Sequence, residues 1–318
     1  MSSLTFRESG TIPQLGLGTW KSKPGEVKQA VIEAIKIGYR HIDCAFIYNN
    51  EAEIGEAFEY CFENGLVSRR DLFVTSKLWN NAHREEDVVP ALKKTLEDLN
   101  LSYLDLYLIH WPVAQKKEVV FPESPEDFKS LDQIPISETW KGMMSAKEKG
   151  LTQHIGVSNF SSAKLSKLVQ EFPENYPEMN QVELHPYLQQ DELFGFCANH
   201  RILITGYSPL GSGDRQSSNR RENEPVLLDD AVLKNIADRH HASVAQILIA
   251  WHLKRGTVVI PKSVNPGRIE ENFKAQSIEL STSEMDQISD LNRSFRFIDG
   301  SFWTMEGSPY TMDNLWDK

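Results

Sequence analysis

The sequence of 318 residues contains few cysteines, no long apolar segment and no excess of positive charge. Its three cysteines, Cys44, Cys61 and Cys197, lie far apart and form no C-x-x-C pair, which argues against a disulfide framework and against a thiolate metal site. No run of 18 apolar residues occurs, and the N-terminal residues MSSLTFRESG lack the apolar core of a signal peptide. We therefore expect a protein without a membrane span or a bound metal, located in the reducing cytoplasm.

The charged residues are mainly acidic. The 45 Asp and Glu residues outnumber the 34 Lys and Arg residues, which gives a formal net charge of −11. Without a long basic run, this balance argues against a nucleic-acid partner, although it leaves room for a local cationic pocket. Hydrophobic residues make up 40% of the chain and charged residues 25%, which are ordinary values for a folded globular protein.

Short apolar runs alternate with amphipathic stretches along most of the chain. We expect eight strands, at Leu15–Leu17, Tyr39–Asp43, Leu72–Lys77, Leu104–His110, Ile155–Ser158, Asn180–Glu183, Leu203–Ser208 and Val258–Pro261. Apolar residues recur at helical spacing over Gly25–Ile37, Glu51–Asn64, Glu85–Asn100, Ser137–Lys149, Ser161–Gln170, Asp191–Asn199 and Asp230–His240. Such alternation predicts a parallel sheet covered by helices.

Other segments lie outside this alternation. The capping boxes Ser243–Gln246 and Ser281–Glu284 predict two extra helices outside the eight strand–helix units. The N-terminal LTFRESGTIP predicts a β-hairpin that turns at Glu8–Gly10. The polar segments 114–134 and 212–224 predict long strand-to-helix loops, which in a barrel lie on the catalytic face.

Two architectures share this alternation, an open doubly wound sheet and a closed barrel. The open dinucleotide-binding sheet favours G-x-G-x-x-G after its first strand, but in Gly16–Lys21 a lysine replaces the third glycine. Gly211–Gln216 departs from the motif as well, and no G-x-x-x-x-G-K-[ST] occurs. With eight strands and neither fingerprint, we expect residues 1–318 to form a single-domain (β/α)₈ TIM barrel with an N-terminal hairpin and two extra helices.

Ionisable residues end three successive predicted strands. Asp43, Lys77 and His110 follow one another at intervals of 34 and 33 residues, and Tyr48 lies in the loop after Asp43. Neighbouring parallel strands are about 4.8 Å apart, and barrel active sites lie at the carboxyl ends of the strands, so these side chains should form one cluster. A single such residue is more often a solvated strand end, but three in succession favour a site.

The cluster is suited to proton transfer by a phenol. An isolated tyrosine has a pKa of about 10, and a neighbouring ammonium such as that of Lys77 favours the phenolate and lowers this value. Asp43 would hold Lys77 in place, and a neutral His110 would orient a substrate oxygen. This apparatus would protonate an oxygen that gains electron density, as in carbonyl reduction.

Aromatic residues accompany the cluster. Trp20, Trp79 and Trp111 follow three of the predicted strand ends and together predict an apolar small-molecule pocket, although one tryptophan alone would more simply pack a loop. The C-terminal segment carries further aromatic residues, expected either to cap that pocket or to anchor the tail: Phe295, Phe297, Phe302 and Trp303.

Seven segments carry a resemblance to a known family: GYRHIDCAFIYNNEAEIGEA, LFVTSKLW, YLDLYLIHWP, IGVSNF, NQVELHPYLQQ, GYSPLGSG and VIPKSVNPGRIEENF. In this order and at this spacing they resemble the aldo-keto reductases, in the aldose and aldehyde reductase branch. The resemblance implies a (β/α)₈ barrel that binds NADPH without the glycine motif. It also implies that Tyr48 is the proton donor, that Lys77 and Asp43 tune it, and that His110 orients the carbonyl.

The resemblance further implies a cofactor site. The nicotinamide would stack on Tyr207, with its carboxamide held by Ser158, Asn159 and Gln181. The pyrophosphate would lie along Ser208, Pro209, Leu210, Gly211 and Ser212, under a loop in which Asp214 pairs with Lys262 as a latch. The 2′-phosphate would be held by Lys262, Ser263 and Arg268, with Glu271 and Asn272 at the adenine edge. Other implied cofactor residues are Thr19, Trp20, Asp43, Val264 and Asn265. At the position of Asn265 the aldose reductase branch usually has Thr. The implied substrate pocket comprises Trp20, Tyr48, Trp79, His110, Trp111 and Phe121.

We therefore predict NADPH-dependent reduction of aldehydes, and of aldoses or some ketones, by hydride transfer from the nicotinamide and protonation by Tyr48. NADH is the weaker alternative cofactor. The alternative functions are an alcohol or polyol dehydrogenase that runs the reaction in reverse, and a non-catalytic NADPH-binding barrel. Ile298 stands where xylose-specialised members have Asn, which argues against a dedicated sugar reductase. We expect a small carbonyl compound as the binding partner and a monomer, with a dimer as the alternative.

Overall fold

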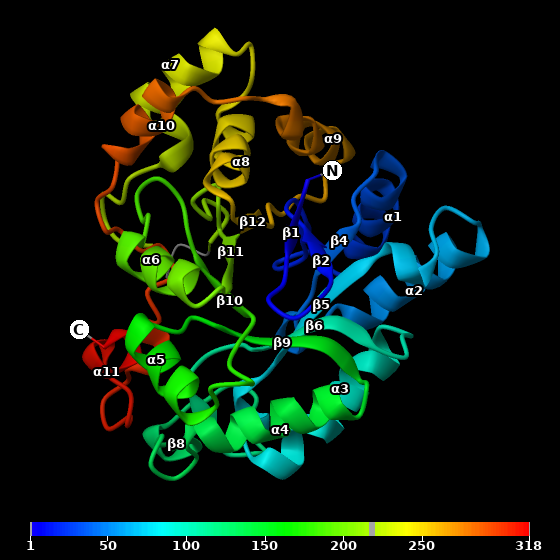
Figure 1. The fold of residues 1–318 in the computed structure, drawn as a ribbon, viewed down its shortest axis with the longest axis vertical. Helices are drawn as coiled ribbons and strands as arrows, with labels where there is room; N and C mark the ends of the chain where they lie inside the picture. The colour runs from blue at the N-terminus through cyan, green and yellow to red at the C-terminus, as the bar shows by residue number, and fades with distance from the viewer. Residues whose placement is uncertain (1, 216–219, 318) are drawn as a thin grey trace.

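The computed structural model describes residues 2–215 and 220–317, and its central feature is an eight-stranded parallel sheet surrounded by helices (Figure 1). The strands follow one another around the sheet in chain order: β3 (Leu17–Gly18), β4 (His41–Asp43), β5 (Phe73–Leu78), β6 (Leu104–Ile109), β9 (Thr152–Ser158), β10 (Met179–Glu183), β11 (Leu203–Tyr207) and β12 (Val258–Val259). Parallel bridges from Leu15 to Val259 and from Gly18 to Lys262 join the last strand to the first. The predicted (β/α)₈ barrel is therefore confirmed.

Helices follow the strands and pack around them. Their bounds are α1 (Val27–Ile37), α2 (Glu51–Glu63), α3 (Glu85–Asp98), α4 (Ile136–Glu148), α5 (Ser162–Glu171), α6 (Asp191–Asn199), α7 (Ala231–Arg239), α8 (Val244–Arg255), α9 (Pro266–Lys274), α10 (Thr282–Ser289) and α11 (Met312–Trp316). The expected helices are all present within a few residues. Two others, α9 and α11, were not among them: α9 begins at a proline after the N-cap Asn265, and α11 is a single short turn capped by Thr311.

The structure changes which helices lie outside the eight units. Between β11 and β12 the chain forms both α7 and α8, and α8 is the one that packs against the barrel, since Ile247–His252 are all buried. The ring of His252 lies 3.1 Å from the carbonyl oxygen of Leu184 at the end of β10. The outer helices are α7, which packs on α8 and α10, and α10 itself. Placing α8 outside was wrong, because a capping box marks where a helix starts and not what it packs against.

The N-terminal hairpin closes one end of the barrel. Its strands β1 (Ser3–Thr5) and β2 (Thr11–Pro13) pair in antiparallel fashion, as predicted, and lie within the ring of strands and helices in Figure 1. Phe6 and Ile12 are fully buried and pack against barrel residues of β5, β6, β10 and β12. The hairpin thus fills the amino-terminal end of the barrel and leaves the carboxyl-terminal end for a site.

The long loop at 114–134 carries more structure than the sequence indicated. It contains a short antiparallel ladder of β7 (Ala114–Gln115) and β8 (Phe128–Lys129). The Tyr310 hydroxyl accepts a hydrogen bond from the Ala114 N–H at 2.7 Å and donates one to the Lys129 carbonyl at 2.7 Å. The C-terminal segment therefore fixes this loop beside the carboxyl ends of the strands. The predicted loop 212–224 leaves the barrel after β11, and its residues 216–219 lie outside the described residues.

Within the described part of the chain, all three cysteines are buried and free. Over the same residues, no helix has both the length and the apolar character needed to cross a bilayer. No group of three or more His, Cys, Asp or Glu side chains there is arranged to hold a metal ion.

Candidate active site

The four polar residues expected to cluster meet at the carboxyl ends of β4, β5 and β6. Asp43 ends β4, Lys77 lies near the end of β5, His110 follows β6, and Tyr48 ends a short 3₁₀ turn at 46–48. The Lys77 ammonium donates to Asp43 Oδ2 at 2.7 Å and to the Cys44 carbonyl at 2.8 Å, and it lies 3.3 Å from the Tyr48 hydroxyl. The structure therefore contains the expected Asp43–Lys77 ion pair, in contact with the phenol.

Burial and charge act against each other in this cluster. Burial lowers the pKa of Lys77, but the attraction of Asp43 and Tyr48 outweighs burial and raises the pKa above its ordinary value. Burial raises the pKa of Tyr48, and the nearby Lys77 only partly offsets it, so the pKa stands at about 12. The expected lowering of the Tyr48 pKa by Lys77 is present, but the effect of burial is larger. Tyr48 is therefore protonated at neutral pH.

His110 is held neutral next to Tyr48. Burial, and then the charge of Lys77, places its pKa well below the ordinary value. The buried ring nitrogen Nδ1 has no hydrogen-bond partner among the described residues, and the ring lies edge-on to Tyr48, with centroids 5.8 Å apart. The Asn159 amide donates to the His110 carbonyl at 2.9 Å and so fixes its backbone. A neutral imidazole can donate a hydrogen bond from one ring nitrogen and so orient an oxygen beside the phenol.

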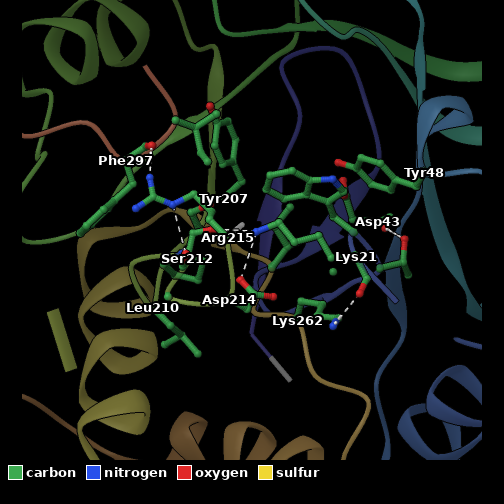
Figure 2. Close-up of a pocket in the computed structure, with 18 of the residues that line it drawn as sticks. Lys21, Asp43, Tyr48, Tyr207, Leu210, Ser212, Asp214, Arg215, Lys262 and Phe297 are labelled. Carbon is green, nitrogen blue, oxygen red and sulfur yellow. Dashed lines mark hydrogen bonds and ion pairs between the residues drawn. The ribbon is translucent and has the colours of Figure 1, made fainter. Parts of the chain in front are cut away.

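Asp43, Tyr48 and His110 line a cavity of about 1610 Å³ at this end of the barrel, and Figure 2 labels Asp43 and Tyr48 among its residues. The volume exceeds the roughly 300–1,000 Å³ of sites for one drug-sized molecule. Most of the site residues expected from the sequence line it: Thr19, Trp20, Asp43, Tyr48, Trp79, His110, Trp111, Phe121, Ser158, Asn159, Gln181, Tyr207, Ser208, Pro209, Leu210, Ser212, Asp214, Lys262, Ser263, Val264, Arg268, Glu271 and Asn272. Of the remaining three, Lys77 is fully buried behind Tyr48, and Gly211 and Asn265 are not among the described lining residues.

Polar strand ends next to the cluster bond to one another. The Gln181 amide donates to Asp43 Oδ1 at 2.7 Å, and the Tyr207 hydroxyl donates to Asn159 Oδ1 at 2.7 Å. The Ser158 hydroxyl donates to the Gln181 carbonyl at 2.8 Å. Asn159 adopts a left-handed backbone conformation with φ of 65°, which asparagine tolerates better than most residues. The Asn159 amide also donates to the Ser158 hydroxyl at 3.2 Å, so the four residues form one hydrogen-bonded chain that ends on the Asp43 carboxylate.

The other end of the cavity is cationic. Lys262 and Arg268 line it together with Ser263. The Asn265 side chain caps α9, because its oxygen accepts a hydrogen bond from the Arg268 backbone N–H at 3.0 Å. These positive groups form a local cationic pocket, which the overall net charge of −11 did not exclude.

Asp214, which we expected to pair with Lys262, pairs with a different lysine in the structure. Asp214 Oδ1 lies 3.1 Å from the Lys21 ammonium, which also donates to Ser212 at 3.0 Å. Lys262 instead donates to the Lys21 carbonyl at 3.2 Å, so Lys21 lies between the two expected partners. Figure 2 shows Lys21 reaching the loop at Ser212 and Asp214.

Comparison with known proteins decides the family. The model of the aldo/keto reductase family matches residues 14–293. The chain belongs to this family. It is 53% identical over 307 residues to an aldo/keto reductase of Synechocystis sp., covering 96% of this chain and 94% of the relative. It is 47% identical over 304 residues to aldo-keto reductase family 1 member A1 of Gallus gallus, covering 95% and 92% of the two chains. A crystal structure of a Bombyx mori aldo-keto reductase in complex with NADP matches with a TM-score of 0.86 at 38% identity, over 96% of this chain and 97% of that one.

The aldo-keto reductase has an aromatic wall beside Tyr48 and His110. Trp79 is packed against His110, with ring centroids 5.3 Å apart, and Trp303 lies 5.7 Å from Trp79. Trp111 lies 5.9 Å from Trp303. Of the C-terminal aromatic residues, Phe297, Phe302 and Trp303 line the cavity, while Phe295 packs on Phe297 behind it, at 5.0 Å between ring centroids. Both expectations for the C-terminal segment therefore apply, since Phe297, Phe302 and Trp303 cap the pocket and Phe295 helps to anchor the segment.

Some residues of the reductase site had no signal in the sequence. Lys21 follows the predicted Trp20 and Arg215 follows Asp214, but neither belongs to a recognisable pattern. Ile47, Asp299 and Ser301 also line the cavity. They come from loops and from the short 3₁₀ turns at 46–48 and 301–303, which are too short for a periodicity that would indicate which side chains face inward.

Proposed function

We propose that this aldo-keto reductase reduces aldehydes to alcohols with NADPH, with Tyr48 as the proton donor. The observation that carries the proposal is a protonated, partly buried phenol in contact with a fully buried ammonium, 3.3 Å away, in a cavity of about 1610 Å³. Family membership makes the chain an NADP-dependent oxidoreductase, and the NADP complex of the Bombyx mori relative agrees with that cofactor. The role of each residue is our proposal.

The cavity has the size and chemistry to hold NADPH and a small substrate together. We propose that Lys262, Ser263 and Arg268 hold the 2′-phosphate, since two cations and a hydroxyl line the same cavity and a guanidinium binds phosphate in bidentate fashion. Tyr207, Ser158, Asn159 and Gln181 would hold the nicotinamide beside Tyr48. When bound, NADPH supplies the hydride that reduces the carbonyl carbon.

The side chains of this protein bind, orient and protonate the substrate oxygen. Tyr48 and neutral His110 donate hydrogen bonds to the carbonyl oxygen and polarise it. As negative charge develops on that oxygen, Tyr48 transfers its proton, and the adjacent Lys77 ammonium stabilises the phenolate that remains. Asp43 holds Lys77 at 2.7 Å, and the pair is excluded from water, which strengthens its electrostatic effect.

The aromatic wall supports aldehydes with an apolar body as substrates. Trp79, Trp111, Phe121 and Trp303 all line the cavity near His110. Ile298 lines it as well and offers no hydrogen bond to a sugar hydroxyl. We propose a broad aldehyde reductase for aliphatic and aromatic aldehydes, with short sugar aldehydes as poorer substrates. The single-domain organisation, monomeric state and cytoplasmic location stay predictions.

The test is a steady-state assay of purified protein with an aldehyde panel, both cofactors and both reaction directions, followed by NADPH absorbance. The Tyr48→Phe variant should lose about 10²–10⁴-fold in kcat/KM while it retains NADPH binding. Tyr60→Phe is the matched control, because Tyr60 is an exposed tyrosine on α2 outside the cavity. Parental turnover by Tyr48→Phe would refute the mechanism, and equal kcat/KM with NADH and NADPH would refute the cofactor preference. Faster alcohol oxidation than aldehyde reduction would favour the reverse function.

A further inference from the structure

The backbone of Phe297 joins three parts of the molecule through its N–H and its carbonyl group. Its N–H donates to Glu183 Oε1 at 2.6 Å, and the next N–H, that of Ile298, donates to Glu183 Oε2 at 2.7 Å. Its carbonyl accepts a hydrogen bond from the Arg215 guanidinium, as Figure 2 shows. Strand β10, which ends at Glu183, is thereby bonded to the C-terminal segment, and that segment is bonded to the loop after β11.

Glu183 is a buried carboxylate with its charge compensated. It is fully buried and does not line the cavity, so it touches neither the proposed substrate nor the proposed cofactor. His185 Nε2 lies 2.8 Å from Glu183 Oε1. Burial raises the pKa of Glu183, but His185, the nearby Arg296 and the Phe297 N–H together outweigh burial and lower it. An ionised carboxylate that accepts two backbone N–H groups is a strong and directional anchor.

The anchored residues begin the part of the chain that shapes the substrate side. We call residues 297–303 the substrate wall, because Phe297, Ile298, Asp299, Ser301, Phe302 and Trp303 all line the cavity. Asp299 of the wall is ion-paired with Arg221 of the loop after β11. The far end of the wall, Trp303, packs on Trp79 and Trp111. A shift at Phe297 would therefore move the surface that faces His110 and loosen the loop over the cationic end.

We infer that Glu183 is a positioning residue that sets the KM for bulky aldehydes and the affinity for NADPH by anchoring the substrate wall and, through it, the loop at Arg215. The inference rests on the proposed aldehyde reductase function. A small aldehyde needs only Tyr48 and His110, whereas a bulky one also contacts the wall, so the two substrates respond differently when the wall moves.

The test variant is Glu183→Gln, which keeps the side-chain shape but places an NH₂ group against one of the backbone N–H donors. Glu178→Gln is the matched control. Glu178 is likewise buried, lies 2.9 Å from a His154 ring nitrogen and directly precedes β10, but it lies at the opposite end of that strand from the cavity. Both variants remove a buried carboxylate bonded to a histidine, and both are expected to lose stability.

The measurements are kcat and KM for propanal and for 4-phenylbenzaldehyde, together with the NADPH Kd from tryptophan fluorescence. We expect Glu183→Gln to raise the KM for the bulky aldehyde about tenfold and to weaken NADPH binding severalfold, with kcat for propanal unchanged within about twofold. Glu178→Gln should leave all of these at parental values. Glu183→Asp, which keeps the charge but shortens the reach, should give an intermediate KM ratio, and it decides the question if Glu183→Gln does not fold.

A parental ratio of the two KM values in the folded Glu183 variant would overturn the inference. An equal change in the Glu178 variant would overturn it as well, because the effect would then follow from lost stability alone. Absence of aldehyde turnover by the parent protein would refute the proposed function instead, so the two failures are distinguishable.

Discussion

We expect Glu51 to make the stability of this protein depend on pH near neutrality. It is the first residue of α2, is 4% exposed, and accepts hydrogen bonds from Ser76 at 2.5 Å and from Thr95 at 3.0 Å. Burial raises its pKa from 4.5 to about 7, and the two hydroxyl groups only partly offset this. The perturbation we consider is Glu51→Gln, which keeps the size of the side chain and removes the ionisation.

The size of the effect follows from the shift in pKa. The difference between 4.5 and about 7, at about 1.4 kcal/mol per unit, corresponds to about 3 kcal/mol. Because the folded-state pKa is raised, the native protein binds this proton more tightly than the unfolded chain. The contribution is therefore fully present below about pH 4.5 and is lost as the pH rises through about 7.

The assay is urea denaturation of the parent and of Glu51→Gln at several pH values between about 5 and 8. The free energy of unfolding of the parent should fall relative to that of the variant by up to about 3 kcal/mol across this range. Glu59→Gln, at an exposed position of the same helix, is the control and should show no such trend. A difference between parent and Glu51→Gln that stays constant with pH would refute the reasoning.

Three other substitutions test other parts of the structure. Lys77→Met leaves the Asp43 carboxylate buried without its cation, so urea denaturation should show a loss of about 3–5 kcal/mol, and a loss below about 1 kcal/mol would contradict the importance of the pair. Burial of Glu284 raises its pKa, but hydrogen bonds from Ser281, His240 and Arg239 prevail and lower the pKa to about 2, so its stabilisation is present above pH 4.5 and lost as the pH falls toward 2. Thermal melts of Glu284→Gln should accordingly differ from the parent at neutral pH and converge with it in acid. Gly206→Ala would place a Cβ 2.3 Å from the His252 ring, so calorimetry should show a destabilisation of about 1–3 kcal/mol, and an unchanged Tm would be inconsistent with that close approach.

The sequence by itself determined the barrel and the composition of its reaction centre. Eight apolar runs in alternation with amphipathic stretches specify a parallel sheet, and the missing glycine motifs leave the closed form. Asp43, Lys77 and His110 could be placed together because the carboxyl ends of neighbouring parallel strands meet at the same edge of a sheet. The order of the strands along the chain and the spacing of their ends are properties of the sequence, so they can be predicted without coordinates.

Only the tertiary structure decided how the loops and the charges are arranged. Asp214 pairs with Lys21 and not with Lys262, and α8 packs on the barrel while α7 lies outside it. The pKa of Tyr48 is raised because burial outweighs the neighbouring ammonium, a balance that depends on how much water the folded chain excludes. Glu183 ends a predicted strand, but nothing in the sequence indicates that its carboxylate bonds to residues more than 100 positions away. Loop contacts and desolvation arise from segments distant in the chain that meet only on folding, so no local pattern encodes them.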